Sequence, residues 1–119
     1  YDNDGDQDVV VTAFNGELRL YRNDLAGTGT HWLRVLLDTQ GAPGLAPNGS
    51  GTLVQARVGE RTYTRYAGNC AHYLTQSEAA LHFGLGGAGR IDELTVTWPN
   101  GTTTTLRDLP ADQTITVKP

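Results

Sequence analysis

Apolar and polar residues alternate along most of this chain, which is the period of a β-strand with one buried face. The alternation is clearest in four segments, in which every second side chain is apolar: Leu33-Val35-Leu37, Val54-Ala56-Val58, Leu81-Phe83-Leu85 and Leu94-Val96-Trp98. Many short strands separated by Gly and Asn are typical of a sandwich or a barrel. The pattern therefore predicts an all-β fold, and only residues 74–81 are expected to allow a short helical turn.

A shorter unit precedes this strand-rich region. Residues 1–24 are expected to form an acidic loop and a β-hairpin, with Val9 at the start of the first strand and Leu18 and Leu20 on the return strand. Asn15-Gly16 between the strands predicts a type I′ turn, because both residues tolerate positive φ. A connector of small residues, 26–30, then leads into a second unit, residues 31–119. Its first two strands are separated by a long loop, residues 41–49, which is expected to be exposed.

Composition and charge narrow the function classes. The chain has 119 residues and 15 glycines, with a formal net charge of -4. Four of its 13 acidic residues lie in the first eight positions, which leaves 9 acids against 9 basic residues elsewhere. This balance predicts neither nucleic-acid binding nor attraction to a membrane surface. No apolar run approaches the roughly 20 residues of a spanning helix, so no membrane insertion is expected.

The acidic loop is a candidate calcium site. It contains carboxylates at alternate positions, Asp2, Asp4, Asp6 and Asp8, and Gly5 permits a sharp bend. Calcium takes six to eight oxygen ligands in flexible geometry. In the favoured register, D-x-D-x-D-G-x-x-D, the first member falls just before Tyr1, and Asp6 offers its backbone carbonyl. An EF-hand is disfavoured because a Val-rich strand follows. The alternative is a solvated acidic cap without a cation.

Residues 1–24 resemble the end of an FG-GAP (VCBS-type) calcium-loop repeat. The remainder resembles the ASPIC/UnbV domain, which follows such repeats in secreted proteins such as cartilage acidic protein. The matching segments are His31-Trp32-Leu33-Arg34-Val35, Tyr73-Leu74-Thr75-Gln76-Ser77, Leu81-His82-Phe83-Gly84-Leu85-Gly86, Val96-Thr97-Trp98-Pro99-Asn100-Gly101 and Leu109-Pro110-Ala111-Asp112-Gln113-Thr114. The match departs at Asn69-Cys70-Ala71-His72 and in the loop of residues 41–49.

This resemblance implies an immunoglobulin-like antiparallel β-sandwich preceded by a calcium-loop β-hairpin. It also implies a secreted, extracellular or cell-surface location, with calcium as the cofactor held by Asp2, Asp4, Asp6 and Asp8. The expected function is a non-catalytic binding or adhesion module, whose partner is another extracellular protein or a glycan. We expect no enzyme activity.

The alternative function is a structural subunit of an extracellular filament. A single hairpin cannot form a four-stranded propeller blade, so its strands would present unpaired backbone groups. Copies of this chain could complete one another by strand pairing, and head-to-tail contacts that do not close produce filaments.

The remaining motifs carry weaker signals. Gly84, Gly86 and Gly89 match G-x-G-x-x-G, but a strand follows where a dinucleotide site needs a helix. A zinc site from His31, Cys70, His72 and His82 is disfavoured by irregular spacing. His82 lies between Leu81 and Phe83 and is expected to face the opposite side of the sheet. Cys70 is predicted to be a buried small residue or, alternatively, an intermolecular disulfide partner. Asn48 and Asn100 begin N-x-[ST] sequons and are candidate N-glycosylation sites, with turn formation as the alternative at Asn100. The lack of methionine predicts a removed leader or a segment of a longer protein.

Overall fold

The chain folds into β-strands. A computed structural model describes residues 1–2, 4–25, 29–68 and 75–119. Within these ranges the strands are β1 (Val9–Thr12), β2 (Leu18–Tyr21), β3 (His31–Leu37), β4 (Leu53–Val58), β5 (Arg61–Tyr66), β6 (Ala80–Gly86), β7 (Arg90–Thr97), β8 (Thr103–Pro110) and β9 (Gln113–Val117). A 3₁₀ turn, η1 (Pro47–Gly49), precedes β4. No helix in the described ranges is long and apolar enough to cross a bilayer.

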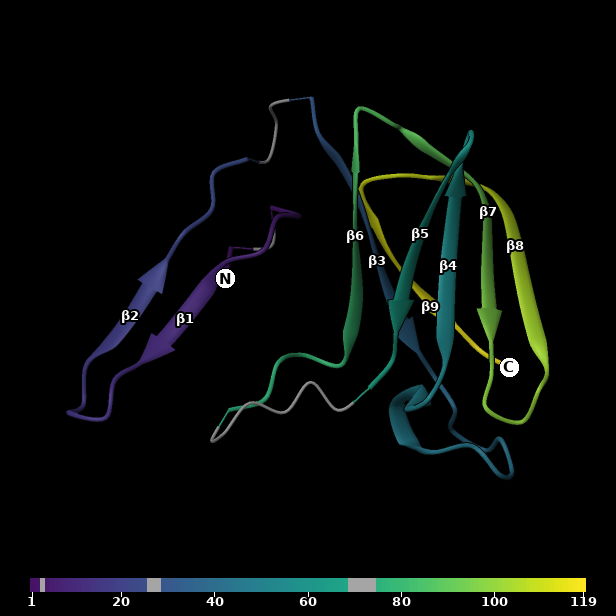
Figure 1. Ribbon diagram of the computed structural model, residues 1–119, viewed down its shortest axis with the longest axis horizontal. Helices are drawn as coiled ribbons and strands as arrows, with labels where there is room; N and C mark the ends of the chain where they lie inside the picture. The colour runs from purple at the N-terminus through teal and green to yellow at the C-terminus, as the bar shows by residue number, and fades with distance from the viewer. Residues whose placement is uncertain (3, 26–28, 69–74) are drawn as a thin grey trace.

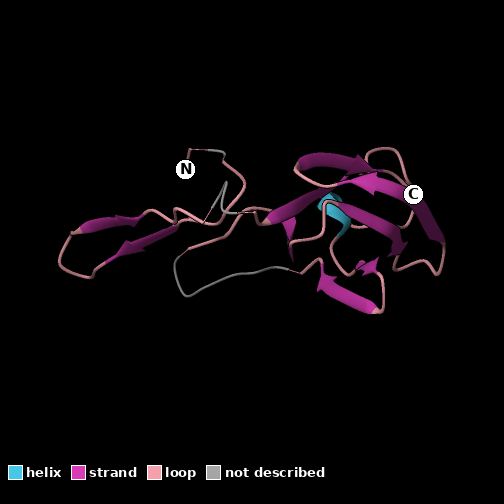
Figure 2. Cartoon of the chain, turned by 90° about the horizontal axis from the view of Figure 1, so that it is seen from above, coloured by secondary structure: helices cyan, strands magenta, loops and turns pink. Residues whose placement is uncertain are grey.

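Two sheets form the body of the molecule. One has the strand order β6-β3-β9 and the other β5-β4-β7-β8. Figure 2 shows them as two layers viewed from above. The β3–β9 ladder is parallel, and every other described ladder is antiparallel. The predicted all-β sandwich is therefore confirmed, while its immunoglobulin-like detail stays a prediction.

The core lies between the sheets and follows the alternation in the sequence. Each sheet buries the side chains at alternate positions of its strands. Among the buried residues are Leu33, Val35, Phe83, Val54, Val96 and Trp98. Their neighbours on β3 are half-buried on the other face. That outer face of the three-stranded sheet is where the N-terminal unit lies.

An arginine joins the two sheets where β5 and β6 run close together. Nε of Arg65 donates a hydrogen bond to the carbonyl oxygen of His82 at 2.8 Å. Its guanidinium carbon lies 5.4 Å from the centroid of the Phe83 ring, within the range of a cation–π contact. Arg65 thus covers the core along the side of the sandwich that faces the hairpin.

The β1–β2 hairpin stands apart from the sandwich as a two-stranded sheet (Figure 1). All eight strand residues are exposed. They include large apolar side chains such as Val10, at 60% exposure, and Leu18, at 71%. The hairpin extends the molecule to 46 × 37 × 21 Å.

The predicted type I′ turn at Asn15-Gly16 is wrong. The amide of Gly16 donates to the carbonyl of Ala13, and Gly16 has φ +90°, whereas Asn15 does not have positive φ. The loop therefore has three residues, with a type I turn followed by a left-handed glycine. The Asn100-Gly101 turn has the same form, with a bond from the amide of Gly101 to the carbonyl of Trp98.

Two predictions about loops do not hold in full. Residues 75–79 are not helical, and β6 begins at Ala80, so the described part of 74–81 holds no helical turn. The loop at 41–49 is mostly exposed, but Gly49 is buried and Leu45 packs against the core. Cys70 and His72, and most of the connector at 26–30, fall outside the described residues.

Candidate functional site

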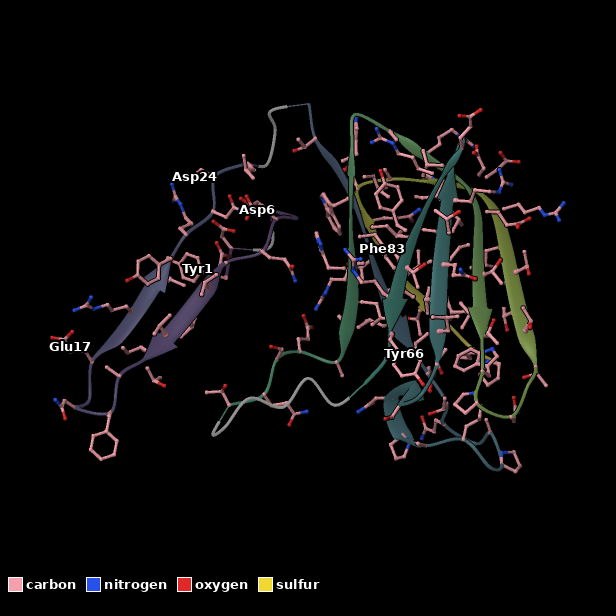
Figure 3. The ribbon with its side chains drawn as sticks, in the orientation of Figure 1. Tyr1, Asp6, Glu17, Asp24, Tyr66 and Phe83 are labelled. Carbon is pink, nitrogen blue, oxygen red and sulfur yellow. The ribbon has the colours of Figure 1, made fainter. Side chains whose placement is uncertain are left out.

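The acidic loop is organised by hydrogen bonds that its carboxylates accept from backbone amides. Oδ1 of Asp4 accepts a bond from the amide of Asp6 at 3.2 Å. Oδ2 of Asp6 accepts from the amide of Leu25 at 2.9 Å, and Oδ1 of Asp8 accepts from the amide of Asn23 at 2.9 Å. Asp6 and Asp8 therefore tie the loop to the chain that leaves β2, and Figure 3 shows Asp6 beside that segment.

Asp8 lies at the junction between the acidic loop and the hairpin. Its side chain is only 5% exposed. Its bond from the amide of Asn23 joins it to the residues that follow β2.

The donor chemistry of the loop fits a hard cation. Asp2, Asp4, Asp6 and Asp8 offer carboxylate oxygens, which calcium prefers. Among the described residues, however, no three acidic, histidine or cysteine side chains are gathered closely enough to hold a metal ion. Asp2 and Asp4 are exposed at the surface of the loop.

Gly5 seats the loop on the outer face of the three-stranded sheet. An added Cβ at Gly5 would lie 1.8 Å from Nε1 of Trp32, so the bare backbone is pressed against the indole. The carbonyl oxygen of Gly5 accepts a hydrogen bond from Nε2–H of His82 at 2.9 Å. The rings of Trp32 and His82 lie nearly parallel, at 13°, with centroids 6.3 Å apart. Sequence reasoning correctly placed His82 on the outer face but missed both of these contacts.

Beside this contact, a groove of about 860 Å³ lies between the N-terminal unit and the sandwich. Its sandwich side is lined by aromatic and charged residues, which include Trp32, Arg34, Arg65, Tyr66 and Glu78. Its other side includes Asp6, Asp8 and Val10. Arg34 of β3 forms an ion pair with Glu78, which lies just before β6. The groove can therefore offer both flat apolar contacts and paired hydrogen-bonding groups.

The two candidate glycosylation sites lie on exposed loops. Asn48 is in η1 with φ +55°, and Asn100 is in the β7–β8 loop. Oδ1 of Asn100 accepts bonds from the amide of Thr102 at 3.0 Å and from its hydroxyl at 2.7 Å. Turn formation at Asn100 is thus present, and the side chain is accessible beside it.

The two described histidines of the set considered for zinc, His31 and His82, have separate partners. Nδ1 of His31 lies 2.6 Å from Oδ2 of Asp112, in the β8–β9 turn. His82 is bonded to Gly5, and the other two members of the imagined set are outside the described residues. Of the glycines in the G-x-G-x-x-G match, Gly84 and Gly86 lie within β6, and Gly89 lies in the connection to β7, so a strand follows the motif as expected.

Comparison with known proteins identifies the sandwich. The family model described as ASPIC and UnbV matches residues 43–119, more than half of the chain. A search of curated proteins gave no match. The matched region contains β4 to β9, and β3 completes it by pairing with both β6 and β9. The chain therefore belongs to the ASPIC and UnbV family.

Proposed function

We propose that this protein is a non-catalytic extracellular binding module associated with calcium through its acidic loop. Residues 1–24, in this proposal, are the end of an FG-GAP/VCBS-type calcium-loop repeat of the kind that precedes the sandwich in cartilage acidic protein. The partner is another extracellular protein or a glycan. Asp2, Asp4, Asp6 and Asp8 are the residues that would hold the ion.

The observation that carries the proposal is the way the loop is built and seated. Its carboxylates fold it against the exit of the hairpin, and its glycine rests on the sandwich. Four carboxylates within seven residues repel one another, and a divalent cation offsets that repulsion. The two described histidines bond to Asp112 and Gly5, which supports structural rather than catalytic roles for them.

Calcium titration calorimetry tests the proposal. Asp2→Asn removes a charge from an exposed side chain of the loop. Asp24→Asn is the control, since it makes the same charge change outside the loop, next to Arg22. We expect the wild type and Asp24→Asn to bind calcium and to gain thermal stability with it. We expect Asp2→Asn to bind more weakly. A wild type that shows neither heat nor a rise in Tm would remove calcium from the function.

A second function is favoured by the exposed hairpin. β1 and β2 pair only with each other among the described strands, and their apolar side chains face solvent. Such open edges invite strand addition. The chain would then be a structural subunit of an extracellular filament, assembled by pairing between copies.

The open edge of β1 can be blocked without breaking the hairpin. The amide of Ala13 points inward, to the carbonyl of Glu17. Because inward and outward amides alternate along an antiparallel strand, the amide of Thr12 points outward. Thr12→Pro removes this outward donor, and Thr12→Val keeps it. Electron microscopy of concentrated protein should show filaments for the wild type and Thr12→Val but not for Thr12→Pro. Monomers throughout would exclude the filament function.

A further inference from the structure

The peptide between Gly5 and Asp6 is held at both of its polar groups. Its carbonyl accepts a hydrogen bond from His82 of β6 at 2.9 Å. Its amide N–H donates to the carboxylate of Asp4 at 3.2 Å. One peptide unit therefore connects a carboxylate of the acidic loop to a side chain of the sandwich.

The neighbouring indole fixes the position of this peptide. Gly5 adopts φ +102°, and a Cβ there would fall 1.8 Å from Nε1 and 2.1 Å from Cε2 of Trp32. Trp32 is half-buried on β3, next to β6 in the same sheet. The loop can therefore approach this closely only because residue 5 lacks a side chain.

We propose that Trp32 and His82 are positioning residues for the acidic loop, and that the sandwich tunes the affinity of the loop for calcium through them. This inference rests on the proposed calcium function. The carboxylate of Asp4 accepts a hydrogen bond from the amide of this peptide. The carboxylate oxygens of the loop are therefore arranged differently for a cation when the loop is docked on the sandwich and when it is not. Linkage is reciprocal: the cation that prefers the docked loop also strengthens docking.

Tryptophan fluorescence measures docking independently of calcium. The chain has two tryptophans. Trp98 is 2% exposed and serves as an internal constant, whereas Trp32 is half-buried under the loop. Gly5→Ala should push the loop away, shift the emission to the red and increase quenching by acrylamide. Gly16→Ala is the matched control, because Gly16 has φ +90° but nothing within 4 Å of an added Cβ. Its spectrum should match that of the wild type.

Calcium affinity measures the coupling. We expect Gly5→Ala and His82→Ala to raise the Kd for calcium by about fivefold or more, the lower end of typical coupling between sites. Gly16→Ala should keep the wild-type Kd. His82→Gln, which retains a side-chain N–H donor, should recover part of the loss. A purely structural role for His82 would not distinguish Gln from Ala at equal Tm.

The outcomes separate this inference from the proposed function. If the wild type binds calcium and both Gly5→Ala and His82→Ala bind it equally well, the coupling is wrong and the calcium function stands. If the wild type binds no calcium, both are overturned. If Gly5→Ala leaves the fluorescence unchanged, or Gly16→Ala changes it equally, Trp32 does not position the loop. His82→Ala keeps the test valid if Gly5→Ala does not fold.

Discussion

His31 and Asp112 are 81 residues apart in the sequence, yet Nδ1 of His31 lies 2.6 Å from Oδ2 of Asp112. The other carboxylate oxygen of Asp112 accepts a bond from the amide of Trp32 at 3.2 Å. The amide of Asp112 in turn donates to the carbonyl of Trp32 at 2.7 Å. The β8–β9 turn is thus fastened to the beginning of β3, the strand that carries Trp32.

This fastening predicts a dependence of stability on pH. The bond from His31, reinforced by the Trp32 amide, holds the pKa of Asp112 below its usual value. A carboxyl group whose pKa is lowered by folding stabilises the fold above its unfolded pKa, about 3.9. That stabilisation is lost as the pH falls through the lower folded pKa. Asp112→Asn should therefore flatten the loss of unfolding free energy below about pH 4, measured with urea.

The solvent exposure of the Asp112 side chain limits the expected loss of stability, and the exposure of Asp108 makes it a suitable control. The Asp112 side chain is 48% exposed, so the loss at pH 7 should be about 1 kcal/mol or less. Asp108→Asn is the control, since Asp108 also has positive φ, which Asn tolerates, and is 83% exposed. Its acid limb should follow that of the wild type. Parallel acid limbs for Asp112→Asn and the wild type would contradict the prediction.

Thr52 should be replaceable by valine with a gain in stability. The Thr52 side chain is fully buried, and its hydroxyl has no hydrogen-bond partner in the part of the chain that the structure describes. Thr52→Val keeps the shape and removes the buried polar atom, which should raise the unfolding free energy by about 1 kcal/mol. The measurement is Tm by circular dichroism.

Thr39 is the matched control for Thr52. It is also buried, but its hydroxyl donates to the carbonyl of Ala46 at 2.9 Å. Thr39→Val should therefore lower stability by about 1 kcal/mol. Equal changes for the two substitutions would show that the hydroxyl of Thr52 is bonded in solution.

Gly49 should tolerate substitution much less well than Gly44 in the same loop. Both have positive φ, so alanine is strained at either site and should cost about 1 kcal/mol. A Cβ at Gly44 meets nothing within 4 Å, whereas one at Gly49 would lie 2.7 Å from Cδ1 of Leu37. Gly49→Ala should cost a further 1–3 kcal/mol or so through overpacking. Equal denaturation midpoints for the two variants would show that Leu37 moves aside freely.

Asn48 and Asn100 should both carry glycans when the protein is secreted from a eukaryotic host. Both lie on exposed loops. Glycosylation uses the amide nitrogen, which leaves Oδ1 of Asn100 able to keep its bonds from Thr102. Asn48→Gln and Asn100→Gln should each remove one glycan by mass spectrometry. An unmodified wild-type mass would assign both sequons to turn formation.

The sequence was sufficient for the strands of the sandwich. Leu33, Val35, Phe83 and Val96 are buried as their alternation predicts, because each points to one face of a pleated strand. The alternation also placed His82 on the opposite face. Local chemistry was less reliable for the Asn15-Gly16 turn, because the same dipeptide fits both a two-residue loop and the three-residue loop that forms.

The sequence by itself determined that four carboxylates alternate around Gly5 and that strands follow them, because these features depend on neighbours along the chain. Only the tertiary structure decided where that loop lies. The approach of Gly5 to Trp32 and His82, like the bond between His31 and Asp112, joins residues that no local pattern relates. Such contacts arise when sheets pack and bring distant segments together, so only the assembled fold defines them.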